Sequence, residues 1–133
     1  MSETATPRIA GILETCLYVE DLERASRFYA EVLGLERMDV FEPQRLIPMI
    51  APGPNLLLLF KRGASPDHDS AGRQHVAFSI AASDLAAWEQ RLVAHGIAIE
   101  EKKRWERGGT SLYFRDPDGH LLELATPGVW PVY

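Results

Sequence analysis

The chain has 133 residues, of which 46% are hydrophobic and 25% charged, with a formal net charge of −5 at pH 7. These values predict one domain, residues 1–133, with its own core. The interleaved charges and the lack of a long apolar run argue against nucleic acid or a membrane as partner. The single cysteine, Cys16, excludes an internal disulfide, and no apolar signal core stands near the N-terminus, so we expect a cytoplasmic protein.

The first half of the chain predicts a strand, a helix and three further strands. After a loose terminus, residues 9–19 alternate as a strand does. Asp21 is the expected N-cap of a helix over residues 22–33, and Gly34 is the residue expected just past its end. The three strands are expected at residues 36–41, 45–50 and 56–61.

The same order of elements recurs in the second half. A polar linker at residues 62–73 precedes a strand at residues 74–80 and an amphipathic helix that ends at Gly96. The last strands are expected at residues 97–105, 110–114 and 120–125. Two βαβββ modules, at about residues 9–61 and 74–126, therefore predict an α+β fold: a cupped, mostly antiparallel sheet with both helices on its outer side.

The final two strands carry an unusual carboxylate. The turn Asp116-Pro-Asp-Gly119 that joins them has the proline and glycine of a hairpin. In the last strand Leu122 and Leu124 share one face, and Leu121 and Glu123 share the other. Burial of an unpaired carboxylate is costly, so Glu123 requires a cation, hydrogen bonds or water.

Two further residues, like Glu123, are predicted to face inward and are candidates for metal ligands. Glu14 and His75 each stand five residues before the apolar residue that ends the first strand of their own module. Carboxylate, imidazole and carboxylate on three strands suit a divalent metal and leave positions for water or substrate. From the residues alone, the simpler interpretation is a hydrogen-bonded strand histidine and two solvated glutamates.

Three other residues are candidates for contacts with a substrate. Cys16 shares the predicted face of Glu14, although a lone cysteine is more often a small buried hydrophobe. Tyr113 is able to donate a hydrogen bond to a substrate oxyanion, or to serve as a core tyrosine. Lys103 is able to bind an anionic substrate, or to protect a solvated edge strand.

Taken together, these segments resemble the vicinal oxygen chelate superfamily, which includes glyoxalase I, the fosfomycin-resistance enzymes, extradiol dioxygenases and the bleomycin-resistance proteins. The resemblance covers about residues 12–126 and implies paired βαβββ modules that form a cupped sheet around a metal. The resemblance depends on three segments: Tyr18-Val-Glu-Asp-Leu22, Gln74-His-Val-Ala-Phe-Ser-Ile80 and Tyr113-Phe-Arg-Asp-Pro-Asp-Gly-His-Leu-Leu-Glu-Leu124.

The resemblance implies a set of metal ligands. His75 and Glu123 match ligand positions of the family, and Glu14 stands where its members usually have histidine or glutamine. Leucines at residues 56–59 replace the fourth ligand of glyoxalase I. With no thiolate in the set, the expected metals are Zn, Mn, Fe, Ni or Co, and zinc is the first expectation because of its availability. Glu14 or Glu123 is expected to act as a base and Tyr113 as a donor.

The expected function is a glyoxalase-like, metal-dependent lyase or isomerase that acts on a small oxygenated substrate. One alternative is a fosfomycin-type thiol transferase or another antibiotic-resistance protein, in which Lys103 and Tyr113 match residues that hold the phosphonate. Another is a non-catalytic drug- or metabolite-binding protein of the bleomycin-resistance type. A homodimer is expected, with Glu14 from one subunit and His75 with Glu123 from the other.

Overall fold

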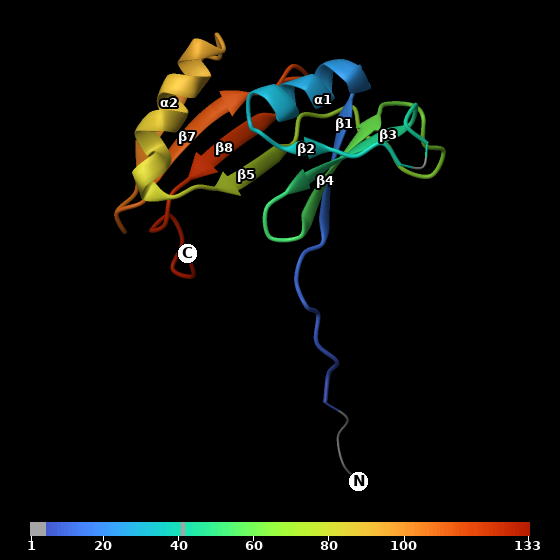
Figure 1. Cartoon of the computed structure of the whole chain (residues 1–133). Helices are drawn as coiled ribbons and strands as arrows, with labels where there is room; N and C mark the ends of the chain where they lie inside the picture. The colour runs from blue at the N-terminus through green and yellow to red at the C-terminus, as the bar shows by residue number, and fades with distance from the viewer. Residues whose placement is uncertain (1–4, 41) are drawn as a thin grey trace.

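The strands of the computed structural model, which describes residues 5–40 and 42–133, form two four-stranded sheets (Figure 1). The strand order is β1-β4-β3-β2 in the first sheet and β5-β8-β7-β6 in the second. In each sheet the first pair is parallel and the other two are antiparallel, which confirms the predicted α+β fold. The strands are β1 (Glu14–Val19), β2 (Glu36–Arg37), β3 (Leu46–Ala51), β4 (Asn55–Lys61), β5 (His75–Ser79), β6 (Glu101–Arg104), β7 (Thr110–Arg115) and β8 (Leu121–Ala125).

One helix accompanies each sheet. Helix α1 (Leu22–Glu31) contacts β2, β3 and β4, and α2 (Leu85–Ala94) runs along the second sheet after a short 3₁₀ turn (Figure 1). The predicted cap of α1 is confirmed, because Asp21 Oδ1 accepts a hydrogen bond of 3.0 Å from the backbone N–H of Arg24. No helix in the described part of the chain has the length and apolar character needed to cross a membrane.

The core lies on the helix-facing sides of the two sheets. As the alternation of the sequence predicts, Leu17 and Val19 of β1 and Leu122 and Leu124 of β8 are buried there. The opposite face of the first sheet carries a second, smaller apolar cluster, formed by Leu46, Leu58 and Phe60 with Cys16, Tyr18 and Leu56 packed against them. The opposite face of the second sheet is more open, and it carries the polar residues of interest.

The first strand is shorter than its pattern predicts. Strand β1 begins at Glu14 because its partner β4 begins at Asn55, and Glu14 pairs with Leu56. The preceding residues therefore project from the sheet, and Ile9 and Ile12 are 90% and 80% exposed. The strand predicted at residues 36–41 is reduced to β2; Phe41 lies outside the described residues, as do residues 1–4 of the predicted loose terminus.

A buried carboxylate joins the two halves of the chain. Asp116, at the start of the β7–β8 turn, is 4% exposed and its Oδ2 accepts a hydrogen bond of 2.6 Å from the hydroxyl of Tyr29 in α1. Its Oδ1 accepts the backbone N–H groups of Asp118 and His120, both at 2.9 Å. The turn predicted from proline and glycine thus also provides a polar contact between the first helix and the second sheet.

The imidazole of His120 makes a second contact of this kind. His120 is fully buried; its Nδ1 accepts the N–H of Gln74 at 2.9 Å, and its Nε2 donates to the carbonyl of Tyr18 at 2.8 Å. Both ring nitrogens of His120 are used by the backbone. The end of β1 is therefore tied to the start of β5 and β8.

Replacement of Asp21 with alanine should lower the free energy of unfolding by about 1 kcal/mol, because the N–H of Arg24 loses its only side-chain acceptor at the N-terminus of α1. Urea denaturation monitored by circular dichroism measures this change. Asp67→Ala, at a carboxylate with 85% side-chain exposure, is the matched control and should change the stability by less than about 0.5 kcal/mol. Equal stabilities of the two variants would contradict the assigned cap.

Candidate functional site

Two of the three predicted ligands meet on the open face of the second sheet. Strands β5 and β8 are parallel neighbours, with His75 opposite Leu121 and Ala77 opposite Glu123, so His75 and Glu123 point to the same side. The Nε2 atom of His75 lies 3.2 Å from Oε1 of Glu123. The histidine side chain is 47% exposed and that of the glutamate 9%, so the pair has one solvent-facing and one buried member.

The hydrogen bonds of His75 leave Nε2 facing the carboxylate. Its Nδ1 is 2.9 Å from the carbonyl oxygen of Leu121, which only accepts, so Nδ1 carries the proton in a neutral ring. The lone pair of Nε2 then faces Oε1 of Glu123, an arrangement that needs a proton or a cation between them. Two ligands that each lie about 2.0–2.2 Å from one zinc ion are roughly 3 to 3.5 Å apart, so the pair fits such a metal.

The second carboxylate oxygen of Glu123 is held by the sheet itself. The hydroxyl of Ser111 in β7 donates to Oε2 at 2.5 Å, and Ser111 accepts the indole N–H of Trp105 at 2.9 Å. Charge-assisted hydrogen bonds of this kind are short and strong. The hydrogen bond from Ser111 accounts for the burial of Glu123, a carboxylate that the sequence predicted to need a partner.

Tyr113 and Lys103 border this pair. Tyr113 lies opposite Glu123 in the register of β7 and β8, and the centroid of its ring is 6.4 Å from that of His75. Burial and, next, the charge of Glu123 raise the pKa of the Tyr113 phenol above 10, so it keeps its proton at neutral pH and is available as a donor. The ammonium of Lys103 lies 4.1 Å from the centroid of the Trp105 ring, a cation–π contact.

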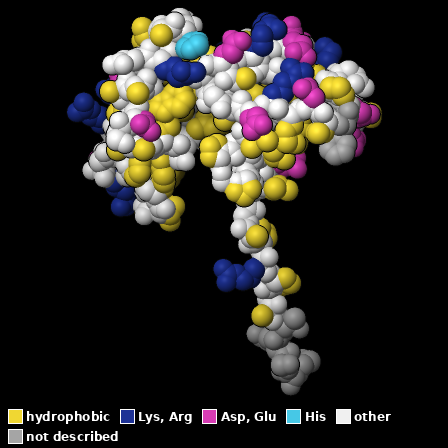
Figure 2. All heavy atoms as spheres, viewed as in Figure 1, with side chains coloured by type: hydrophobic (Ala, Val, Ile, Leu, Met, Phe, Trp, Pro, Cys, Tyr) yellow, Lys and Arg dark blue, Asp and Glu magenta, His cyan; other side chains and the backbone are white. Residues whose placement is uncertain are grey.

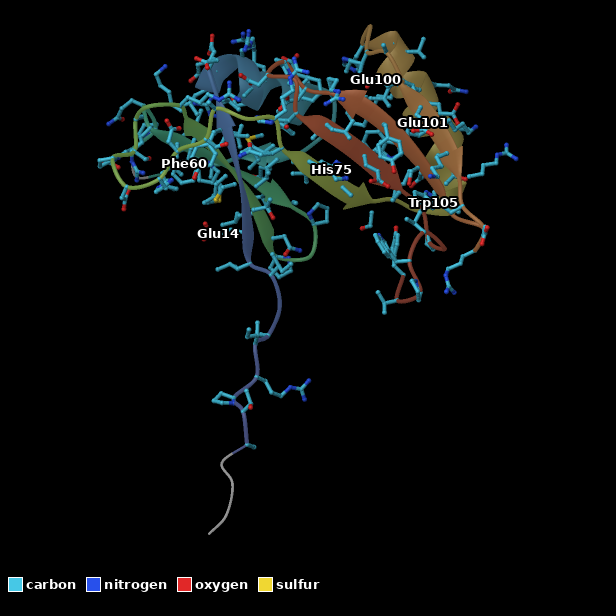
Figure 3. All side chains as sticks on the ribbon, turned by 180° about the vertical axis from the view of Figure 1, so that it is seen from behind. Glu14, Phe60, His75, Glu100, Glu101 and Trp105 are labelled. Atoms are coloured by element: carbon cyan, nitrogen blue, oxygen red, sulfur yellow. The ribbon has the colours of Figure 1, made fainter. Side chains whose placement is uncertain are left out.

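Glu14 does not join this group within one chain. It lies at the start of β1 in the first sheet, whereas His75 stands on β5 of the second sheet (Figure 3). Across residues 5–40 and 42–133, no three His, Cys, Asp or Glu side chains converge as a metal site. Cys16, two residues along β1, packs against the smaller apolar cluster; burial and the charge of Glu14 raise the pKa of its thiol.

Glu14 instead borders an open apolar cleft of about 330 Å³ between the two sheets. Hydrophobic side chains line the hollow between the two lobes in Figure 2. Its walls come from β1, β4, β5, the segment after α1, and α2, and include Leu33, Leu35, Val76, Phe78 and Trp88. Trp88, which has the helical spacing of a core residue, is only half-buried and forms part of this wall.

The role of Ser111 and the hydrogen bond of Trp105 were not predicted from the sequence. Ser111 precedes Tyr113 by two residues, so strand alternation places both on one face, but a serine there gives no sign of its partner. Its contact with Glu123 depends on the register of β7 against β8.

The paired-module fold and the His75–Glu123 pair define a class of proteins built from two βαβββ units. The family model described as "Glyoxalase/Bleomycin resistance protein/Dioxygenase superfamily" matches residues 11–124. The chain belongs to this superfamily, as the resemblance implied.

Individual relatives give more detail. The metallothiol transferase FosB of Staphylococcus epidermidis is 30% identical over 120 residues, 89% of this chain and 82% of the relative. FosB of Bacillus licheniformis is 45% identical over 64 residues, but that match spans 47% of this chain and only 40% of the relative. Among solved structures, a lactoylglutathione lyase from Agrobacterium tumefaciens superimposes with a TM-score of 0.85 at 31% identity, over 94% of this chain and 99% of that one.

Proposed function

We propose that this protein is a divalent-metal-dependent enzyme that transfers a thiol to a small oxygenated substrate. The observation that carries the proposal is the 3.2 Å approach of His75 Nε2 to Glu123 Oε1, with the other oxygen of Glu123 fixed by Ser111. Nitrogen and oxygen donors without a thiolate suit Zn, Mn, Fe, Ni or Co, and zinc is proposed first because of its availability. His75 and Glu123 are assigned as ligands, and Glu14 as the third.

Glu14 is proposed to come from a second copy of the chain. Its place on the other sheet prevents it from reaching His75 and Glu123 of its own chain, and a two-fold dimer supplies two complete sets. Large apolar side chains are exposed on the N-terminal segment and at the C-terminus, where a partner subunit would cover them: Ile9, Ile12, Leu13, Trp130 and Val132.

The residues around the pair fit an oxyanionic substrate. A bound metal acts as a Lewis acid toward substrate oxygens. Tyr113, whose phenol stays protonated, donates a hydrogen bond to a substrate oxygen, and Lys103 adds positive charge at the rim. Glu14 or Glu123 accepts a proton, and Cys16, two residues from Glu14 on the same face of β1, is proposed as a substrate contact.

Two observations favour thiol transfer over isomerisation. The two FosB relatives are named metallothiol transferases, and the one from Staphylococcus epidermidis aligns with 89% of this chain. In addition, strand β4 offers no carboxylate as a further ligand: Leu57 and Leu59 face the core, and Leu58 belongs to the smaller apolar cluster. The second candidate is a lactoylglutathione lyase activity, favoured by the similarity to the Agrobacterium tumefaciens structure.

An assay of the zinc-loaded protein separates the two reactions. Loss of free thiol from glutathione or L-cysteine in the presence of fosfomycin, and its absence without metal, would support thiol transfer. Formation of S-lactoylglutathione from methylglyoxal and glutathione would support the lyase instead. If neither reaction proceeds and the protein binds no divalent metal, a binding protein of the bleomycin-resistance type takes the place of both proposals.

A mixing experiment tests the shared site. Glu14→Ala and His75→Ala chains, each expected to bind little zinc alone, should recover up to one intact site per mixed dimer after subunit exchange. Equilibrium dialysis with zinc measures the recovery, and light scattering measures the oligomeric state. Two copies of the same variant mixed together are the control. A monomer at micromolar concentration, or no recovery despite proven exchange, would refute the shared site.

A further inference from the structure

We propose that Ser111 and Trp105 are positioning residues that hold Glu123 with one carboxylate oxygen directed toward His75. The inference rests on the proposed metal site and adds two residues to it. Neither residue is assigned as a ligand. They form a single chain of hydrogen bonds, from the indole of Trp105 through Ser111 to Glu123, with lengths of 2.9 and 2.5 Å.

The chemistry of the donors fixes the direction of this chain. An indole N–H only donates, so Ser111 Oγ is the acceptor toward Trp105. A serine hydroxyl has one hydrogen, which is then directed to Oε2 of Glu123. The Ser111 hydroxyl therefore donates to Oε2, while Oε1 faces His75 Nε2 at 3.2 Å.

The serine hydroxyl meets Glu123 at a buried position. Ser111 is fully buried and Glu123 is 7% exposed, so loss of the hydroxyl removes the donor that Oε2 has at a buried position. A glutamate side chain also has several rotatable bonds, and the hydrogen bond restricts it to the rotamer that faces His75. Ser111 therefore contributes orientation as well as a hydrogen bond.

The turn that carries Trp105 is itself fixed. The backbone N–H of Trp105 donates to the carbonyl of Gly109 at 2.8 Å, and that of Gly108 donates to the carbonyl of Trp105 at 2.9 Å. A Cβ atom on Gly109 would lie 2.4 Å from the backbone nitrogen of Val129, so the C-terminal segment packs directly on this turn. The contact with the Lys103 ammonium also helps to hold the indole ring in place. Figure 3 shows Trp105 at the edge of the second sheet.

The test is zinc affinity, measured by competition with a chromophoric chelator. Ser111→Ala should weaken zinc binding by about 10- to 100-fold, the range found when a residue that orients a metal ligand is removed. Trp105→Phe, which keeps an aromatic ring but loses the N–H, should weaken it by a smaller factor. Ser79→Ala, an exposed serine on the same face in β5, is the control and should bind zinc as the wild type does.

A double-mutant cycle separates positioning from a general structural role. If Trp105 acts through Ser111, Trp105→Phe has no further effect on zinc affinity once Ser111 is alanine. The proposal would be overturned if the two substitutions weakened zinc affinity by factors that multiply in the double variant. It would also be overturned if Ser111→Ala bound zinc with wild-type affinity. If Ser111→Ala fails to fold, wild-type affinity in Trp105→Phe would overturn it equally. Absence of zinc binding by the wild type would instead refute the proposed function.

Discussion

Replacement of Glu123 with alanine should weaken zinc binding by more than about 100-fold, since loss of a residue that only orients a ligand already costs about 10- to 100-fold. The substitution removes the oxygen that lies 3.2 Å from His75 Nε2. It also leaves the Ser111 hydroxyl without its acceptor. Metal content after remetallation and dialysis, determined by elemental analysis, measures the effect together with a zinc titration.

Glu101→Ala is the matched control for this substitution. Glu101 is an exposed glutamate on β6 that pairs with Tyr113, so it lies on the same face of the sheet without contact to His75 (Figure 3). Its loss should leave zinc affinity within about twofold of the wild type, as expected for an exposed charge that makes no ligand contact. If the wild type and Glu123→Ala both contain negligible zinc, the proposed metal site is contradicted. If both bind zinc equally tightly, the proposed role of Glu123 as a ligand is contradicted.

Replacement of Asp116 with alanine should lower the free energy of unfolding by about 3 kcal/mol, because each buried donor left without an acceptor costs about 1–3 kcal/mol. Three donors lose their acceptor: the hydroxyl of Tyr29 and the backbone N–H groups of Asp118 and His120. Urea denaturation with an unchanged m-value measures the loss. Asp67→Ala serves again as the exposed control, and a similar stability of both variants would show that the contact between the halves contributes little.

The same contact predicts a dependence of stability on alkaline pH. Burial, followed by the charge of Asp116 and its hydrogen bond, raises the pKa of the Tyr29 phenol well above 10. The contribution to stability is therefore complete below pH 10, where the phenol is neutral in both the folded and the unfolded chain. It is lost as the pH rises from 10 through the folded-state pKa. Tyr29→Phe should abolish this part of the alkaline destabilisation, which thermal unfolding at a series of pH values would detect.

Local sequence patterns predicted most of the fold. Strand alternation assigned Leu122 and Leu124 to the core and Glu123 to the opposite face, and the structure confirms this assignment. Asp21 as the cap of α1 followed from its position before an amphipathic segment. These features depend on the periodicity of a strand or helix and on the chemistry of a turn, which involve residues close together in the chain.

Strand limits were less predictable because they depend on partners. The pattern of residues 9–19 suits a strand throughout, yet β1 begins only where β4 offers backbone groups to pair with. Trp88 has the spacing of a core residue, but the neighbouring sheet leaves its side chain on the wall of an open cleft. In both cases the predicted periodicity of side chains is correct, and tertiary packing decides which of these side chains are covered.

The candidate site shows the same division. The sequence by itself determined that His75 and Glu123 stand on strands with their side chains away from the core, because alternation has a period of two residues. Only the tertiary structure brought His75 Nε2 to Glu123 Oε1, placed Ser111 beneath the carboxylate and kept Glu14 on a separate sheet. These contacts depend on the parallel register of β5 against β8 and on which strands become neighbours. His75 and its neighbour Leu121 are 46 residues apart in the sequence, and the pairing of strands so distant is set by the packing of the whole chain.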